Sequence, residues 1–150
     1  MDARQPILVI AVGLPGSGKS TYFDNLRVQA ISTDKIRLQL ADDATDQTVH
    51  GAVFATVRFL IRQRIAIGRP ITYVDATSLT RKDRKFLLAV AKRYGCRAEA
   101  LFFNTPLAVC LERNRNRTRV VPEDVIRKMA GKLQIPTVAE GFALITTVEA

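Results

Sequence analysis

The residues from Gly13 to Ser20 have the types and the spacing of a phosphate-binding loop. The segment Gly-Leu-Pro-Gly-Ser-Gly-Lys-Ser fits the pattern G-x-x-x-x-G-K-[ST]. Glycines allow backbone N–H groups to turn inward around a phosphate, and the lysine brings a positive charge to the phosphate oxygens. The pattern therefore predicts a nucleotide site. The alternative is a glycine-rich turn that binds nothing.

The same segment supplies the groups expected to hold ATP and Mg²⁺. We expect nucleotide contacts from Gly13, Pro15, Gly16, Ser17, Gly18, Lys19, Ser20 and Thr21. The Lys19 ammonium is expected to reach the β- and γ-phosphates, and the Ser20 hydroxyl to hold Mg²⁺. Because the sequence has no guanine motif of the Asn-Lys-x-Asp kind, ATP is the expected nucleotide, with GTP left open.

Asp34 and Arg37 could act on the group that accepts a phosphoryl. Asp34 closes a short predicted strand, and Arg37 follows three residues later on the same helix face. A carboxylate there could take a proton from an attacking hydroxyl, and the arginine could hold a phosphate of the acceptor. The alternative is an aspartate that only caps a helix and an arginine in a surface ion pair.

Asp75 ends another apolar segment, Thr72-Tyr73-Val74-Asp75. Proteins with a phosphate-binding loop place an acid at this position, close to Mg²⁺ or to the acceptor. We therefore expect Asp75 near Mg²⁺ or near the acceptor. The alternative is an aspartate that caps a helix or closes a turn.

The segment from Arg113 to Arg119 carries four arginines in seven residues. Alternating arginines without acids repel each other unless an anion neutralises them. A loop of this kind, closing over the phosphates, could supply an arginine to the transferring phosphoryl group. The alternatives are a solvated basic loop and a contact with a nucleic-acid backbone.

Short apolar segments alternate with amphipathic ones, which predicts an α/β fold with a parallel sheet between helices. The expected strands are 7–12, 30–33, 71–74 and 98–103, with 142–148 as a candidate last strand. The expected helices are 18–27, 36–40 with Asp34 as its cap, 46–67, 80–94, 106–113 and 122–133. In helix 80–94 the residues expected to be buried are Phe86, Leu87, Val90 and Ala91. In such sheets ligands bind at the carboxyl ends of the strands.

Length and composition indicate one domain over residues 1–150, in a chain of 150 residues that is 47% hydrophobic. The net charge of +9 favours an anionic partner, or else a basic surface kept for solubility. A single histidine, His50, excludes a histidine-based metal site. Two cysteines, Cys96 and Cys110, fit reduced thiols in a cytoplasmic protein, and we expect neither a membrane span nor a secretory signal.

The chain resembles the kinase domain of polynucleotide 5′-hydroxyl kinases, the end-healing enzymes of RNA and DNA repair, which are P-loop kinases of the AAA_33 type. The stretches that carry the resemblance are GLPGSGKS at 13–20, STDKIR at 32–37, VDATSLTRKDR at 74–84 and LERNRNRTRVVPEDVIRKM at 111–129. The resemblance spans 7–142. It implies a three-layer P-loop NTPase fold, adenylate-kinase-like, with an arginine-rich lid at 113–121.

The resemblance also implies a role for each matching residue. Asp34 matches the general base that activates a 5′-hydroxyl, and Arg37 matches the arginine that grips the acceptor's phosphate. Arg117 matches the lid arginine on the ATP phosphates, with Arg113 as a second contact. The remaining matches are Lys19 and Ser20 on the phosphates and Mg²⁺, and Asp75 and Thr77 as a pair near the acceptor.

The acceptor expected from the resemblance is a 5′-hydroxyl end of RNA or DNA. Such kinase domains are usually fused to a phosphatase, a ligase or another repair domain, whereas we expect only the kinase domain in these 150 residues. A small-molecule P-loop kinase and a nucleotide-dependent switch without an acceptor are the alternatives. A polynucleotide acceptor predicts a cationic track beside Asp34, formed by Arg37 and by Arg81, Lys82, Arg84 and Lys85. The oligomeric state is left open.

Overall fold

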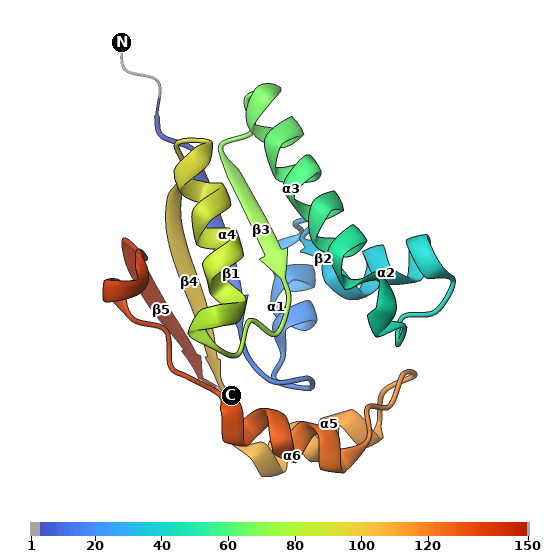
Figure 1. The fold of residues 1–150 in the computed structure, drawn as a ribbon. Coiled ribbons are helices and arrows are strands. Elements are labelled where there is room, and N and C mark those ends of the chain that lie inside the picture. Colours follow the sequence, from blue (N-terminus) through green and yellow to red (C-terminus); the bar gives the residue numbers. More distant parts are fainter. Residues whose placement is uncertain (1–3, 150) are drawn as a thin grey trace.

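Five parallel strands form the centre of the molecule, and helices cover both faces of the sheet (Figure 1). The computed structural model describes residues 4–149. The strands lie in the order β2-β3-β1-β4-β5, and every neighbouring pair is parallel. Their bounds are β1 Ile7–Val12, β2 Ile31–Ser32, β3 Ile71–Asp75, β4 Arg97–Asn104 and β5 Leu144–Glu149. The predicted α/β fold with a parallel sheet is confirmed.

The helices pack on three sides of this sheet. Their bounds are α1 Lys19–Leu26, α2 Thr33–Ala41, α3 His50–Ala66, α4 Arg81–Arg93, α5 Leu107–Arg115 and α6 Glu123–Lys132. Leu8 and Ile10 point to the face covered by α2, α3 and α4, whereas Val9 and Ala11 point to the face covered by α1. Helices α5 and α6 close a third apolar cluster around Leu14 at the carboxyl ends of the strands (Figure 1).

The predicted elements all form, and two of them differ in detail. The expected helix 46–67 begins with a 3₁₀ turn, Gln47–Val49, so that α3 itself begins at His50. Asp34 does not cap α2, because the Ser32 hydroxyl accepts the hydrogen bond from the Lys35 N–H at 3.3 Å. The Asp34 carboxylate lies in the first turn instead, where it is free to face the cavity described below.

The prediction for the buried face of α4 is wrong at one position. Phe86 is 37% exposed, while Arg84 is fully buried. Arg84 lies three residues before Leu87 and seven before Ala91, which places it on the same helix face as these core residues. The buried cysteines Cys96 and Cys110 are free thiols. No helix within residues 4–149 is long and apolar enough to cross a membrane.

Candidate active site

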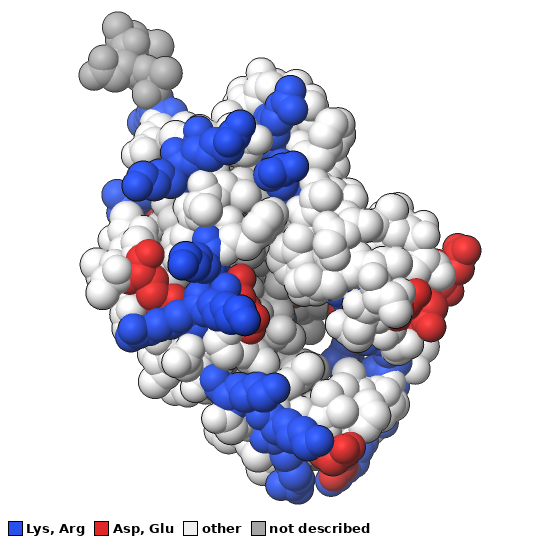
Figure 2. Space-filling view, in the orientation of Figure 1, with Lys and Arg blue, Asp and Glu red and all other residues white. Residues whose placement is uncertain are grey.

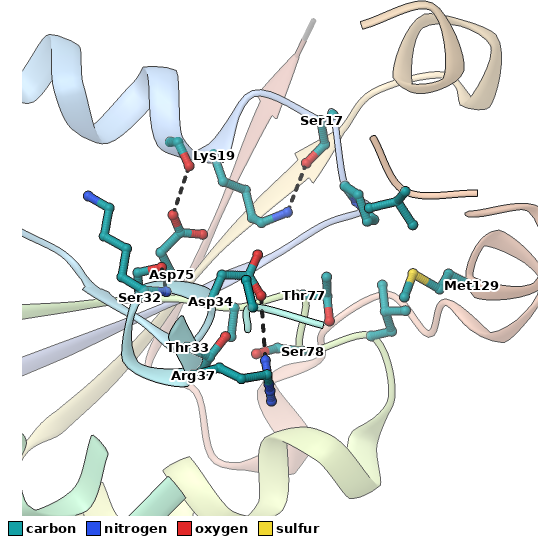
Figure 3. A pocket seen from close by; sticks show the side chains of 18 of the residues that line it. Ser17, Lys19, Ser32, Thr33, Asp34, Arg37, Asp75, Thr77, Ser78 and Met129 are labelled. Carbon is teal, nitrogen blue, oxygen red and sulfur yellow. Dashed lines mark hydrogen bonds and ion pairs between the residues drawn. The ribbon is translucent and has the colours of Figure 1, made fainter. Parts of the chain in front are cut away.

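A cavity of about 1760 Å³ opens at the carboxyl ends of the strands. The loop between β1 and α1, the first turn of α2, the end of β3 and the segment after α5 all line it. These elements bring Lys19, Asp34, Arg37, Asp75, Thr77, Arg113 and Arg117 to one cavity, although they lie far apart in the sequence. Figure 3 shows the side chains of Lys19, Asp34 and Asp75 converging there.

The glycines of the 13–20 loop are required by its backbone. Gly16 and Gly18 have positive φ angles of 80° and 101°, a region that L side chains rarely adopt. A Cβ on Gly16 would lie 2.6 Å from the Cys110 carbonyl oxygen, and one on Gly13 would lie 2.7 Å from the Ser17 Oγ. The loop is therefore held against α5 with its backbone wrapped around the N-terminus of α1, the geometry that binds phosphate.

The Lys19 side chain is buried inside this loop. Its Nζ donates to the Gly13 carbonyl at 2.9 Å and to the Leu14 carbonyl at 2.8 Å. Burial lowers the pKa of Lys19 from 10.5 to about 8, against the opposing attraction of Asp75. A bound phosphate would supply the anion that this poorly solvated ammonium lacks.

The side chain of Ser20, in the first turn of α1, contacts that of Asp75, at the end of β3. The Ser20 hydroxyl donates to the Asp75 Oδ2 at 3.0 Å. The Thr77 carbonyl accepts a hydrogen bond from the Gly13 N–H at 3.0 Å, which ties the segment after β3 to the phosphate-binding loop. Thr77 lines the cavity, as does Thr21, whose side chain is exposed at the start of α1.

These oxygen groups fit Mg²⁺, a hard cation that binds few protein ligands and keeps waters or phosphate oxygens as the others. The Ser20 hydroxyl and the Asp75 carboxylate, which lie 3.0 Å apart on the cavity lining, could supply two protein oxygens. Within residues 4–149, no group of three or more His, Cys, Asp or Glu side chains could hold a metal alone. A cation here would therefore depend on a bound polyphosphate.

Asp34 and Arg37 form the opposite wall of the cavity. The Asp34 side chain is 53% exposed, and that of Arg37 is only 7% exposed. The Arg37 Nη1 is 3.5 Å from the Asp34 Oδ1, a long and weak contact, and the buried Arg37 Nε has no hydrogen-bond partner. Arg37 is thus a nearly dehydrated cation that faces a cavity with little to neutralise it.

The arginine-rich segment reaches this wall through Arg119, which our sequence analysis did not single out. The Arg119 Nη1 donates to the Asp34 Oδ2 at 2.9 Å, and its Nη2 donates to the Ala44 carbonyl at 3.4 Å. Arg113 and Arg117 also line the cavity, and Arg113 lies near Gly18. The alternation of arginines in 113–119 was the available signal, but it did not distinguish Arg119 from the others.

Asn114 fixes the shape of this segment. The fully buried side chain of Asn114 donates to the Val121 carbonyl at 2.6 Å and accepts from the Val121 N–H at 2.9 Å. This pair of bonds closes the residues between them into a loop that carries Arg117 and Arg119. No pattern in the sequence indicates this role, because an asparagine among arginines is typical of any polar loop.

Comparisons with known proteins agree with this geometry. A family model described as an AAA domain, AAA_33, matches residues 8–136. The L-seryl-tRNA(Sec) kinase of Methanococcus maripaludis is 25% identical over 142 residues, which cover 87% of this chain and 53% of that protein. The chain thus spans about half the length of this curated relative.

Two solved structures have the same fold. A Chloroflexus aurantiacus protein described as a kinase superposes with a TM-score of 0.75 at 17% identity, covering 99% of this chain and 87% of that one. The Pnkp1/Rnl/Hen1 RNA repair complex gives a TM-score of 0.73 at 20% identity, covering 89% of this chain and 45% of that one. The sheet and its helices therefore have a P-loop kinase fold, and the chain belongs to the AAA_33 family.

Proposed function

We propose that the protein is an ATP-dependent kinase that phosphorylates the 5′-hydroxyl end of RNA or DNA. The observation that carries the proposal is the pairing of two different sites in one cavity. One is a glycine loop around a buried lysine, and the other is an exposed carboxylate beside a buried, poorly neutralised arginine. The first suits a triphosphate, and the second suits a hydroxyl attached to a phosphate.

The 13–20 loop would hold the ATP phosphates. Its backbone N–H groups and the α1 N-terminus attract the anion, and the Lys19 ammonium turns from the Gly13 and Leu14 carbonyls to the β- and γ-phosphates. Arg113 and Arg117 approach from the lid and neutralise the same oxygens. Ser20, held by Asp75, would bind Mg²⁺, which offsets phosphate charge when it is present.

Asp34 would act as the general base. Its carboxylate accepts the proton of the acceptor hydroxyl, whose oxygen bonds to the γ-phosphorus while the bond from that phosphorus to the β–γ bridging oxygen breaks. The products are ADP and a phosphate monoester. The other Asp34 lone pairs stay free for this proton although Arg37 and Arg119 contact both oxygens, because a carboxylate has about four acceptor sites.

Arg37 would bind a phosphate of the acceptor. A dehydrated guanidinium with an unpartnered Nε gains most from an anion that replaces its missing hydrogen bonds. In a polynucleotide the first phosphate lies one nucleotide from the 5′-hydroxyl, so Asp34 and Arg37 would grip the two ends of the same terminal nucleotide.

The basic surface supports a polynucleotide acceptor. Figure 2 shows lysine and arginine side chains gathered over α4 and α6 on the face where the cavity opens. Arg81, Lys82 and Lys85 are exposed on α4, and Lys82 lines the cavity. Arg84 is fully buried and cannot bind a ligand at the surface, so the prediction that it belongs to a cationic track is wrong. The exposed cations of α4 would carry the track without it.

Labelled ATP offered with 5′-hydroxyl oligonucleotides and, separately, with a panel of small alcohols tests the proposal. We expect transfer to the oligonucleotide, and an Asp34→Asn variant that loses about 10²- to 10⁴-fold in kcat with ATP affinity unchanged. Asp24→Asn, an exposed change on α1, serves as the matched control. Transfer to small alcohols alone would contradict the polynucleotide acceptor, and equal loss of ATP binding would contradict the role of Asp34.

A further inference from the structure

Three aromatic rings from α3 and α4 lie together on the lining of the cavity. His50 and Phe54 project from successive turns at the start of α3, with ring centroids 4.6 Å apart. The ring of Phe86 on α4 makes an edge-to-face contact with that of Phe54, with the ring centroids 5.6 Å apart. All three line the same cavity as Asp34 and Arg37.

Phe86 contacts Phe54, which packs against the core, but Phe86 itself lies outside the core. The core beneath α4 is made by Leu87, Val90 and Ala91, and Phe86 belongs to none of the apolar clusters of residues 4–149. Phe86 is 37% exposed, whereas the other three residues of α4 that were predicted to be buried are buried. An aromatic ring directed into a ligand cavity rather than into the core offers a flat apolar face to whatever enters.

The charges around the rings indicate the class of ligand. Arg58 follows Phe54 by one turn of α3, and Lys82 precedes Phe86 by one turn of α4. Both cations line the cavity, so each ring has a cation as its neighbour on the same helix face. A nucleotide matches both features, because its base is flat and apolar on its faces while its phosphates are anionic. An aliphatic alcohol or a sugar acid has no flat face to stack, and it would leave the rings uncovered.

We infer that the rings of His50, Phe54 and Phe86 form a subsite that stacks the base of the acceptor's 5′-terminal nucleotide. The inference rests on the proposed function and deepens it by naming the part of the acceptor that is recognised. The base lies on the rings, the 5′-hydroxyl lies at Asp34, and the following phosphate lies at Arg37. Since every base has a stacking face, the subsite selects nucleotides over other alcohols without selecting a sequence.

An oligonucleotide whose 5′-terminal nucleotide lacks its base tests the inference without changing the protein. Stacking on an aromatic side chain contributes about 1–3 kcal/mol per base, so we expect the acceptor KM to rise by roughly 5- to 150-fold for the abasic oligonucleotide. A Phe86→Ala variant acting on the intact oligonucleotide should show a rise of the same order. The two changes together should cost little more than either alone, because both remove one interaction.

Phe59→Ala is the matched control, because Phe59 lies on the same helix as Phe54, is 55% exposed and does not line the cavity. Its acceptor KM should equal that of the native protein. Phe86→Leu separates the loss of the ring from a loss of folding, and it should still raise the KM. An abasic acceptor with an unchanged KM would overturn the inference while leaving the polynucleotide kinase proposal intact. A native protein that phosphorylates no oligonucleotide would overturn both.

Discussion

Arg84 and Arg37 are two buried arginines at the same end of the sheet, and their surroundings are opposite. The Arg84 side chain is fully buried, and each of its guanidinium nitrogens has a partner. Its Nε and Nη2 bind the two oxygens of Glu140 at 2.8 and 3.1 Å, and its Nη1 reaches backbone carbonyls. Arg37 has one contact of 3.5 Å and a buried Nε with no partner.

The difference shows how a structural cation is distinguished from a binding one. Dehydrating a guanidinium costs several kcal/mol, and Arg84 recovers this cost within the protein because it joins α4 to the 134–140 segment. Arg37 offsets little of this dehydration cost, because its one hydrogen bond within the protein is long and its Nε has no partner. Arg37 therefore lowers the stability of the free protein unless an anion binds, which is the trade between stability and function seen at many binding sites.

The largest effect should come from Arg84→Met. It leaves the buried carboxylate of Glu140 and the carbonyls of Ser78 and Gln134 without their donor. We expect the free energy of unfolding to fall by about 3–5 kcal/mol, the usual result of breaking a buried ion pair from one side. Urea unfolding of the two proteins measures it. A loss below about 1 kcal/mol would remove the contrast between the two arginines.

Acid titration provides a check on the same variant. Burial alone would raise the pKa of Glu140, but hydrogen bonds from Arg84 and Thr137 hold the pKa below its usual value. The stability that this carboxylate contributes is therefore present above pH 4.5 and is lost as the pH falls below it. In Arg84→Met this loss should shrink, so that the two unfolding curves approach each other in acid.

Arg37→Met should have the opposite profile. Because the arginine makes so few bonds in the free protein, we expect the free energy of unfolding to change by less than about 1 kcal/mol or to increase. The KM for the acceptor should rise by about 10- to 150-fold, the cost of one charged hydrogen bond, while the affinity for ATP stays the same. Acceptor kinetics and urea unfolding on one preparation test both parts. An unchanged acceptor KM would show that the acceptor phosphate does not bind at Arg37.

The fold was predictable because its signals are local. The apolar segments and the glycine loop place the strands and the 13–20 loop within about two residues, since strand burial and turn geometry depend on neighbouring side chains. The burial of Arg84 was not predicted, because the partners Gln134 and Glu140 lie 50 and 56 residues away in the sequence. The exposed Phe86 and the buried Arg84 both follow from the helix period, which the charged neighbours Arg81, Lys82 and Lys85 obscured.

The candidate site was predictable in part for the same reason. Asp34 and Arg37 lie in the helix that directly follows β2, and Asp75 ends β3, so the topology of the sheet brings them to one edge. The contact of Arg119 with Asp34 joins residues 85 positions apart. It depends on the loop that Asn114 closes, and no local pattern in the sequence specifies that loop.

Lys19 is a third buried cation, and its neutralisation is intermediate between that of Arg84 and that of Arg37. Its ammonium has hydrogen-bond partners, but these are neutral carbonyls. With a pKa of about 8 in the free protein, Lys19 loses its charge as the pH rises through 8. ATP affinity should then fall by up to tenfold for each further pH unit, because the neutral amine cannot attract phosphate. Titration calorimetry between pH 7 and 9.5 measures this, and Lys19→Met should bind weakly with no such dependence. A flat profile for the native protein would show that the lysine stays charged.

The smallest effect should come from Arg119→Met. Arg119 donates at 2.9 Å to the carboxylate that Arg37 contacts weakly, but both partners in this pair are partly exposed, at 35% and 53%. Such pairs contribute about 0.2–1 kcal/mol, so removing Arg119 should lower kcat by no more than about fivefold, by letting the Asp34 carboxylate rotate away from the hydroxyl. The acceptor KM should stay constant, in contrast to Arg37→Met. A larger rise in KM than in 1/kcat would mean that Arg119 binds the acceptor itself, and that the lid rather than α2 holds the second anion site.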